Sequence, residues 1–302
     1  MEKRFITFLK KIIKKLQENL GDEYQIEVKE MEGINNTVKH SLWLIHPDRD
    51  IHPCIHLDAY FEQYKLGTKI NYMVQEILKR CKEDSSVKLS SISNFTSWEN
   101  VKPHIYAKLI HTESNRGLLS KIPNRAYLDL SFVYYVRLES VVNEEYAVIQ
   151  ISNEHMGYWG VKEDMLYQAA WINTINPNEA AIKNIEDILN PVFSTKEFQN
   201  AEKGDELQMY VLSNKYHING AVQMCNHDLL RKAAKALEDD FWILPSSVHE
   251  VILLPVCQTD DCATGLAEIV REINDTQVEL QEILSYHIYY YNRISEETII
   301  AV

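Results

Sequence analysis

Apolar and polar positions in the first 20 residues repeat with a helical period. The apolar positions are Phe5, Leu9, Ile12, Ile13, Leu16 and Leu20, and lysines fall between them. Gly21 follows the run and is a good helix stop. We expect an amphipathic helix that covers a sheet and keeps its lysine face in solvent. A basic amphipathic helix can also lie on a membrane surface, and that is the alternative.

The rest of the N-terminal third alternates between strand and helix patterns. Strands are expected at residues 24–28, 38–45 and 51–57, and helices at 58–64 and, after a break at Gly67, at 70–78. These elements predict a small N-terminal α+β lobe over residues 1–85. Residues 86–124 are the least periodic, with a helical turn at 98–101, a strand at 104–110 and a short helix at 115–122. We expect them to connect two lobes.

Residues 125–302 carry sharper signals and predict a larger C-terminal α+β domain. Hairpins are expected at 127–138 with 146–152, at 208–213 with 218–224, and at 287–293 with 298–302; helices are expected at 161–175, 179–189, 228–237 and 266–274. Strands mostly arrive in adjacent pairs, with helices between the pairs. This order favours an α+β fold, with a mixed, largely antiparallel sheet and packed helices, over a doubly wound one.

The most apolar stretch runs from Asp240 to Cys257 and holds a polar corner, Ser246-Ser247-Val248-His249-Glu250. Strands are expected on either side of it, over Phe241–Leu244 and Val251–Leu254. Ser247 and Glu250 have the spacing of a capping box, in which each side chain accepts a backbone N–H of the same helical turn. We therefore predict a structural corner between two core strands.

Ser247, His249 and Glu250 are also residue types that hydrolases use, so they are the candidate catalytic residues. In an extended strand the serine and the histidine lie about 6.6 Å apart along the chain, too far for a direct hydrogen bond. The chain has no Gly-x-Ser-x-Gly elbow around a serine. These observations favour the structural interpretation of the corner over a catalytic one.

His52, Cys54, His56 and Asp58 alternate along one expected strand and form the candidate metal ligands. Zinc accepts all of these donors. Consecutive residues on one strand face diverge, however, and structural zinc sites gather ligands from separate elements. Pro53 indicates an edge strand with a solvated face. We expect no bound metal.

Other patterns are less specific. Cys257 and Cys262 have neither the spacing of a redox motif nor that of a zinc site. The triple tyrosine Tyr289–Tyr291 is typical of a strand with alternating aromatics, and the alternative is that it stacks on a ligand. A Walker A loop, a Gly-x-Gly-x-x-Gly turn and a His-Glu-x-x-His helix are all missing from the sequence. We expect no cofactor.

Charge and composition limit the class of protein further. Of the 302 residues 45% are apolar and 25% charged, an ordinary globular balance, and no apolar run approaches a membrane span. The net charge of −13 argues against general nucleic-acid binding. The first 20 residues hold six basic and two acidic side chains, a balance of +4, so the remainder carries −17. No signal-peptide pattern is present, and we expect a cytoplasmic protein with reduced cysteines.

Several blocks of sequence occur in an order that resembles a known family. They are Tyr127–Leu130, Trp159-Gly-Val, Met209–Asn214, Asn219-Gly-Ala, Leu244–Pro255, Val270–Asn274, Leu284-Ser and Tyr289–Arg293. From about Ile51 onward the chain looks like an uncharacterised bacterial family known as a domain of unknown function, whose members are often carried by mobile elements. A second uncharacterised bacterial family shares the Trp-Gly-Val and Pro-Ser-Ser-x-His-Glu blocks. The resemblance implies no activity, cofactor or catalytic residue.

Together these patterns favour a non-enzymatic protein-interaction module that binds a protein partner. The acidic body and the missing cofactor motifs support this hypothesis, and the resemblance suggests a mobile-element accessory or anti-defence factor. The alternative is a hydrolase that uses Ser247, His249 and Glu250 in a cleft between the two lobes.

Overall fold

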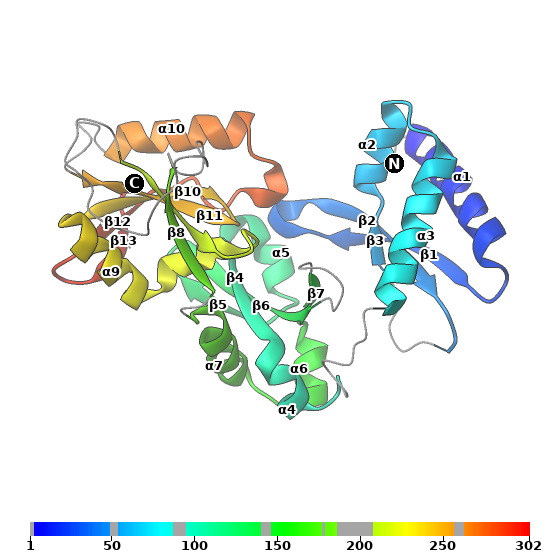
Figure 1. Ribbon diagram of the computed structural model, residues 1–302, viewed down its shortest axis with the longest axis horizontal. Coiled ribbons are helices and arrows are strands. Elements are labelled where there is room, and N and C mark those ends of the chain that lie inside the picture. The colour runs from blue at the N-terminus through cyan, green and yellow to red at the C-terminus, as the bar shows by residue number, and fades with distance from the viewer. Residues whose placement is uncertain are drawn as a thin grey trace. The chain divides into compact units, whose positions relative to one another are not determined.

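The computed structural model describes residues 3–48, 54–86, 95–139, 146–176, 179–185, 208–256 and 263–302 (Figure 1). The chain forms two compact units. The first comprises Met1–Gly33, Thr37–Ser93 and Glu139–Ala147, and the second Ile34–Asn36, Asn94–Leu138 and Val148–Val302. Helices and antiparallel sheets occur in both, so the expected α+β class is confirmed. Within the described ranges, no helix combines the length and the apolar character needed to cross a membrane.

The first unit packs helices against a three-stranded sheet of order β1-β2-β3. Its elements are α1 (Lys3–Leu20), β1 (Gln25–Glu32), β2 (Val38–Ile45), β3 (Cys54–His56), α2 (Asp58–Lys65) and α3 (Ile70–Ser86). Strands β1 and β2 pair in antiparallel register from Gln25 opposite Ile45 to Glu32 opposite Val38. The elements match the pattern expected for this part of the chain, except that β3 is shorter in the described residues.

The apolar face of α1 is buried in the core of the first unit. Phe5, Phe8, Ile12 and Leu16 pack with β2 residues Leu42 and Leu44 and with side chains of α2 and α3. Gly21 follows the helix with φ +76, a left-handed conformation that glycine adopts without strain. Because the apolar face is used inside the protein, it is not available to enter a membrane surface. The prediction of a helix covering a sheet, with lysines in solvent, is confirmed.

The second unit contains a four-stranded sheet built around the long strand β6. Its strands are β4 (Ile105–His111), β5 (Asn124–Tyr127), β6 (Leu130–Glu139) and β7 (Tyr146–Gln150), and β4, β5 and β7 each pair with β6. Helices around it are α4 (Trp98–Val101), η3 (Lys102–His104), η4 (Glu113–Asn115), α5 (Arg116–Leu119), α6 (Asn153–Trp159) and α7 (Glu163–Thr174). The segment 86–124, expected as a connection, thus contributes β4 to this sheet.

A six-stranded antiparallel sheet of order β13-β12-β10-β11-β9-β8 forms the rest of the second unit. Its strands are β8 (Ala180–Asn184), β9 (Tyr210–Asn214), β10 (Phe241–Ser247), β11 (Glu250–Pro255), β12 (Tyr289–Asn292) and β13 (Glu297–Ile300). Helix α10 (Ala263–Thr276) covers one face, and α9 (His227–Leu237) lies on the other side of the sheet, as Figure 1 shows. Two 3-10 helices, η6 (Gly220–Cys225) and η8 (Leu280–Glu282), complete it.

Two secondary-structure predictions are wrong. The helix expected at 179–189 is instead strand β8, which pairs with β9 from Ala180 opposite Asn214 to Asn184 opposite Tyr210; residues 186–189 lie outside the described part. The strand expected at 218–224 is the 3-10 helix η6. In both places the local pattern is ambiguous, and pairing with β9 or packing beneath it decides the conformation.

The polar corner is a turn of a β-hairpin. Strands β10 and β11 pair from Phe241 opposite Pro255 to Ser247 opposite Glu250, so the two expected core strands are confirmed. The capping box is wrong, because the chain makes a tight strand-to-strand turn there and no helical turn. The Ser247 hydroxyl accepts the backbone N–H of His249, and not that of Glu250.

Candidate functional site

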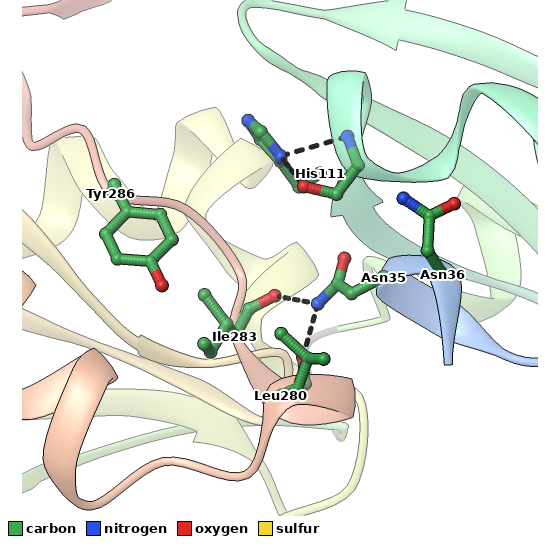
Figure 2. Close-up of a pocket in the computed structure, with 7 residues that line it drawn as sticks. Asn35, Asn36, His111, Leu280, Ile283 and Tyr286 are labelled. Carbon is green, nitrogen blue, oxygen red and sulfur yellow. Dashed lines mark hydrogen bonds between the residues drawn. The ribbon is translucent and has the colours of Figure 1, made fainter. Parts of the chain in front are cut away.

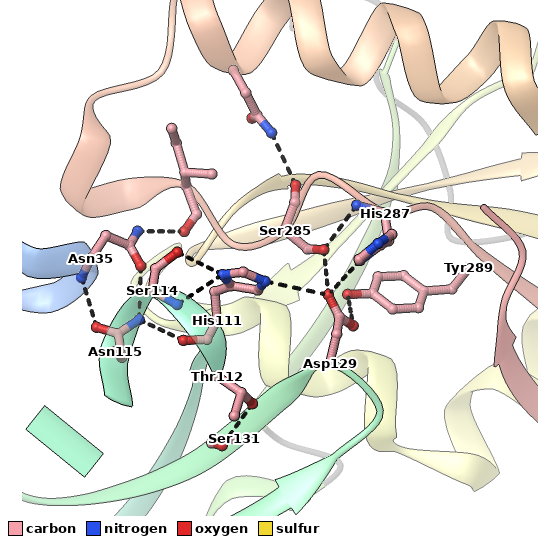
Figure 3. A network of polar contacts seen from close by, with 12 residues as sticks. Asn35, His111, Thr112, Ser114, Asn115, Asp129, Ser131, Ser285, His287 and Tyr289 are labelled. Carbon is pink, nitrogen blue, oxygen red and sulfur yellow. Dashed lines mark hydrogen bonds and ion pairs between the residues drawn. The ribbon is translucent and has the colours of Figure 1, made fainter. Parts of the chain in front are cut away.

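Asp129 sits in the two-residue turn between β5 and β6 and is the centre of a polar network in the second unit (Figure 3). Tyr127 pairs with Leu130, which leaves Leu128 and Asp129 as the turn. Leu128 has φ +54, a costly conformation for a bulky side chain. The Asp129 carbonyl accepts the backbone N–H of Thr112 over 3.0 Å, which fixes the turn against the end of β4.

The Asp129 carboxylate accepts three side-chain hydrogen bonds from one C-terminal segment. Ser285 Oγ lies 2.6 Å away, Tyr289 Oη 2.8 Å and His287 Nδ1 3.0 Å. Burial by itself raises the pKa of Asp129, but these donors outweigh it and leave the pKa below its ordinary value. The carboxylate therefore stays ionised at neutral pH. Only 12% of its side chain is exposed, so the charge is held in a largely dry place.

His111, the last residue of β4, lies on the other side of this carboxylate. Its Nδ1 is 2.7 Å from Ser114 Oγ and accepts the Ser114 backbone N–H at 3.3 Å. Its Nε2 is 3.9 Å from Asp129 Oδ2. Burial lowers the pKa of His111 and so favours the neutral ring. Because Nδ1 accepts a backbone N–H, the ring proton lies on Nε2 and faces Asp129.

A cavity of about 230 Å³ opens beside His111. Its lining residues are Asn35, Asn36, His111, Ser114, Leu280, Ile283 and Tyr286, which come from η1 (Ile34–Asn36), the β4–η4 corner and the η8 segment (Figure 2). The lining thus brings together parts of the chain that are more than 200 residues apart. Polar groups and aliphatic side chains share the wall, and no formally charged side chain lines it.

Asn35 holds the wall of this cavity together. Its amide nitrogen donates to the carbonyl oxygens of Leu280 and Ile283, over 2.7 and 2.8 Å. Its backbone N–H donates to Asn115 Oδ1 over 2.6 Å, and Asn115 returns a hydrogen bond to Asn35 Oδ1 over 2.8 Å. Asn35 and Asn36 both have positive φ, 59 and 57, which asparagine tolerates better than most residues. The side chain of Asn35 is therefore fully engaged, whereas the exposed amide of Asn36 makes no hydrogen bond to the residues that the structure describes.

The three sequence-derived catalytic candidates meet at the β10–β11 turn, but not as a catalytic group. Ser247 Oγ bonds the His249 backbone and not its ring. His249 Nδ1 accepts the Asn219 N–H over 3.0 Å, and its Nε2 lies 3.6 Å from Glu282 Oε1. The carboxylate of Glu250 is 3.9 Å from His217 instead. Each side chain is thus engaged with a different neighbour.

The β10–β11 turn nevertheless contacts the η8 segment, which forms one wall of the cavity. The Val248 N–H donates to the Glu282 carbonyl over 2.8 Å, so the turn is fastened to η8. Two residues of the η8 segment, Leu280 and Ile283, line the cavity. The most apolar stretch of the chain therefore positions one wall of the candidate site.

Two of the four candidate metal ligands, His56 and Asp58, are engaged with protein groups. His52 lies outside the described residues. Cys54 is exposed. His56 Nδ1 lies 3.1 Å from Ser41 Oγ. The Asp58 carboxylate accepts the backbone N–H of His40 over 2.9 Å and lies 2.8 Å from Nδ1 of the His40 ring. Among described residues, no three His, Cys, Asp or Glu side chains are placed to hold one metal ion.

Tyr289 and Tyr291 are buried in β12, which agrees with a strand of alternating aromatics rather than a ligand-stacking row. Tyr290 packs against Trp242 on the neighbouring strand. Cys257 and Cys262 lie outside the described residues.

Sequence reasoning missed Asp129, His111 and Ser114. The blocks Tyr127–Leu130, Leu284-Ser and Tyr289–Arg293 do contain Asp129, Ser285 and Tyr289, but nothing in a block shows that a partner lies 156 residues away. A useful signal was the Leu-Asp turn after Tyr127, since turn carboxylates are often placed for hydrogen bonding.

Comparison with protein-family models identifies the family. A family described as of unknown function, DUF5688, matches residues 5–293. The chain belongs to this family. The match begins well before Ile51, so DUF5688 covers both units and not only the chain from Ile51 onward. No curated protein and no solved structure matches the chain.

Proposed function

We propose that this protein is a protein-interaction module and that the cavity beside η8 receives one side chain of its partner. The observation that carries the proposal is Leu280, which lines the cavity and leaves 58% of its surface exposed. An exposed apolar residue beside a preformed hollow is the arrangement of an interface hot spot. The cavity volume of about 230 Å³ is below the roughly 300–1,000 Å³ of sites for drug-sized ligands.

The surroundings of the cavity indicate the chemistry of the partner. Glu279 and Glu282 flank Leu280 in sequence, and Glu282 keeps 40% of its side chain exposed. Asp275 accepts the hydroxyl of Tyr286, which lines the cavity. Apart from Arg271, whose guanidinium lies 5.4 Å from the Tyr286 ring centroid, these charges are negative. The segment that fits is therefore an apolar anchor flanked by lysine or arginine. The overall charge of −13 supports the same choice and argues against nucleic acid.

The cellular setting is also proposed. The family resemblance suggests a cytoplasmic accessory or anti-defence factor of a mobile element, whose partner is a host or competing protein. A hydrolase that uses Ser247, His249 and Glu250 has less support, because each of these groups is engaged with a different neighbour in the β10–β11 turn.

The test compares matched surface variants in capture experiments. Leu280→Asp is expected to weaken retention of a specific partner by about 30-fold or more, the value for losing a hot spot of 2 kcal/mol. Ile294→Asp is the control, because Ile294 is 87% exposed in the same unit and does not line the cavity. Partners retained equally by wild type and Leu280→Asp contradict the proposal.

A further inference from the structure

We infer that Ser114 and His111 form a nucleophile–base pair, oriented by Asp129, that can cleave a carboxylic ester placed in the cavity. The inference rests on the proposed function only in taking the same cavity as the binding site. It assigns a chemical activity to residues that the sequence did not single out. Both Ser114 and His111 line the cavity, so a group bound there meets them directly.

The distance between nucleophile and base is already within hydrogen-bond reach. Ser114 Oγ lies 2.7 Å from His111 Nδ1, inside the roughly 2.6–3.2 Å expected of such a pair. In the neutral ring the proton is on Nε2, so Nδ1 has a lone pair that can take the hydroxyl proton. A histidine without that lone pair could not act as a base.

Asp129 is a positioning residue in this arrangement. Its carboxylate is 3.9 Å from His111 Nε2 and is itself held by Ser285, Tyr289 and His287. When His111 takes a proton, it becomes an imidazolium whose Nε2–H faces this fixed negative charge. The same pattern of roles, nucleophile then base then buried carboxylate, defines a catalytic triad independently of sequence order.

An amide that can stabilise the reacting oxygen lines the same cavity. The side chain of Asn36 makes no hydrogen bond within the described residues, and asparagine side chains serve as donors to oxyanions in acyl transfer. Asn36 is held at the cavity by its neighbour Asn35, whose own amide is fully used. The cavity lining therefore brings a nucleophile and a base together with an amide that can donate to an oxyanion, and Asp129 lies behind the base.

The reaction proceeds in two balanced steps. Ser114 Oγ attacks the ester carbonyl carbon, its proton moves to His111 Nδ1, and the C–O bond to the alcohol breaks as the leaving oxygen takes that proton. Water then attacks the acyl-serine with His111 as base. The acyl C–O bond to Ser114 breaks, the proton returns to Ser114, and a carboxylic acid leaves.

A purely structural role makes a different prediction for the same contacts. Ser114 is only three residues from His111, and the imidazole also accepts the Ser114 N–H, so this pair could simply close the turn after β4. A serine that only closes a turn does not react with a phosphonate reagent and does not depend on pH through a histidine. Covalent labelling distinguishes these roles.

The whole 302-residue chain is treated with an alkyl fluorophosphonate, and the adduct is mapped by mass spectrometry. Hydrolysis of p-nitrophenyl acetate is followed in parallel. We expect an adduct on Ser114, none in Ser114→Ala, and a loss of turnover of about 100-fold or more in His111→Gln. Ser120→Ala is the control, because Ser120 is exposed and its hydroxyl donates to the Gly117 carbonyl, away from the cavity. Folding of each variant is checked by thermal unfolding.

The pH dependence tests the role of Asp129. Burial has the largest effect on the pKa of His111 and lowers it. Among the neighbouring charges, Asp129 raises this pKa, His287 lowers it and Glu113 raises it. In Asp129→Asn the acid limb of the rate profile should therefore move to lower pH, while kcat falls. An acid limb that stays at the same pH in Asp129→Asn would contradict electrostatic contact between Asp129 and the catalytic base.

Absence of a Ser114 adduct in folded wild-type protein overturns the inference. So does ester turnover that persists in Ser114→Ala. The small reagents need no partner, so labelling without any Leu280-dependent partner leaves this inference standing and removes the proposed function. Partner binding without labelling does the reverse.

Discussion

The Ser285 hydroxyl donates to the Asp129 carboxylate over 2.6 Å, although the two residues lie 156 positions apart in the chain. Through this bond the β5–β6 turn is fastened to the segment that leads into β12. Tyr289 and His287 add two further donors from the same segment. A single ionised carboxylate therefore gathers three of the hydrogen bonds that join the β5–β6 turn to the segment before β12.

Replacing this carboxylate should destabilise the protein in a pH-dependent way. Asp129→Asn is expected to lower the free energy of unfolding by about 2–4 kcal/mol at pH 7, since hydrogen bonds to a charged group are weakened. The pKa of folded Asp129 lies below its ordinary value of 3.8, so its contribution is present above that pH and is lost as pH falls toward the folded value. Urea unfolding at pH 7 and pH 3.5 measures both effects.

The control for Asp129 is Asp228→Asn, because the Asp228 side chain is 81% exposed and pairs with Arg231 on the surface. It should change stability by less than about 1 kcal/mol. Equal effects of the two substitutions would contradict the central role of Asp129.

Gly220 should not tolerate a side chain, although its φ is negative. An added Cβ would meet the backbone nitrogen of Asn214 at 2.5 Å and the His249 carbonyl oxygen at 2.7 Å. Backbone atoms cannot move aside, so Gly220→Ala should cost about 1–3 kcal/mol or more. Gly157→Ala is the matched control in α6, where nothing lies within 4 Å, and should be neutral or slightly stabilising. Thermal unfolding of the pair measures the difference.

The buried ion pair between Arg137 and Glu179 should be sensitive to loss of one charge. Arg137 is 4% exposed, Glu179 is 8% exposed, and their side chains meet over 2.9 Å. Glu179→Gln leaves a buried cation beside Tyr106 and should cost about 3–5 kcal/mol. Glu296→Gln removes an equivalent partner from the exposed Arg231 and should cost less than about 1 kcal/mol. Chemical denaturation that gives similar costs for both variants would refute this reasoning.

The Ser247 hydroxyl is expected to stabilise the β10–β11 turn through the His249 N–H, which it accepts over 3.1 Å. Ser247→Ala should lower the unfolding free energy by about 1 kcal/mol. Glu250→Ala should lower the unfolding free energy by less, since a third of the Glu250 side chain is exposed and its carboxylate lies 3.9 Å from His217 Nδ1. Because these side chains act on different groups, the double variant should be additive and not less than additive, as a shared cap would require. Unfolding midpoints of the three variants decide between the two.

Local sequence by itself determined the elements whose periodicity is unambiguous. The apolar positions in these elements repeat with a period that fits one secondary structure, with one buried face and one solvated face. They are the lysine-faced helix α1, the hairpin of β10 and β11, and the terminal pair β12 and β13. The α+β class follows from the order of such elements. A neighbour along the chain is enough to specify each of them.

Only the tertiary structure decided the rest, because the deciding contacts come from distant segments. Residues 180–184 are a strand since β9 offers a free edge, and residues 220–225 are a 3-10 helix since Gly220 lies against Asn214 and His249. Asp129 is the centre of a site only because folding places Ser285 and Tyr289, which are distant in sequence, within hydrogen-bond distance of its carboxylate. Hydrogen bonds and close packing act over a few ångströms in space and leave no period in the sequence, so the candidate site could be found only in the folded chain.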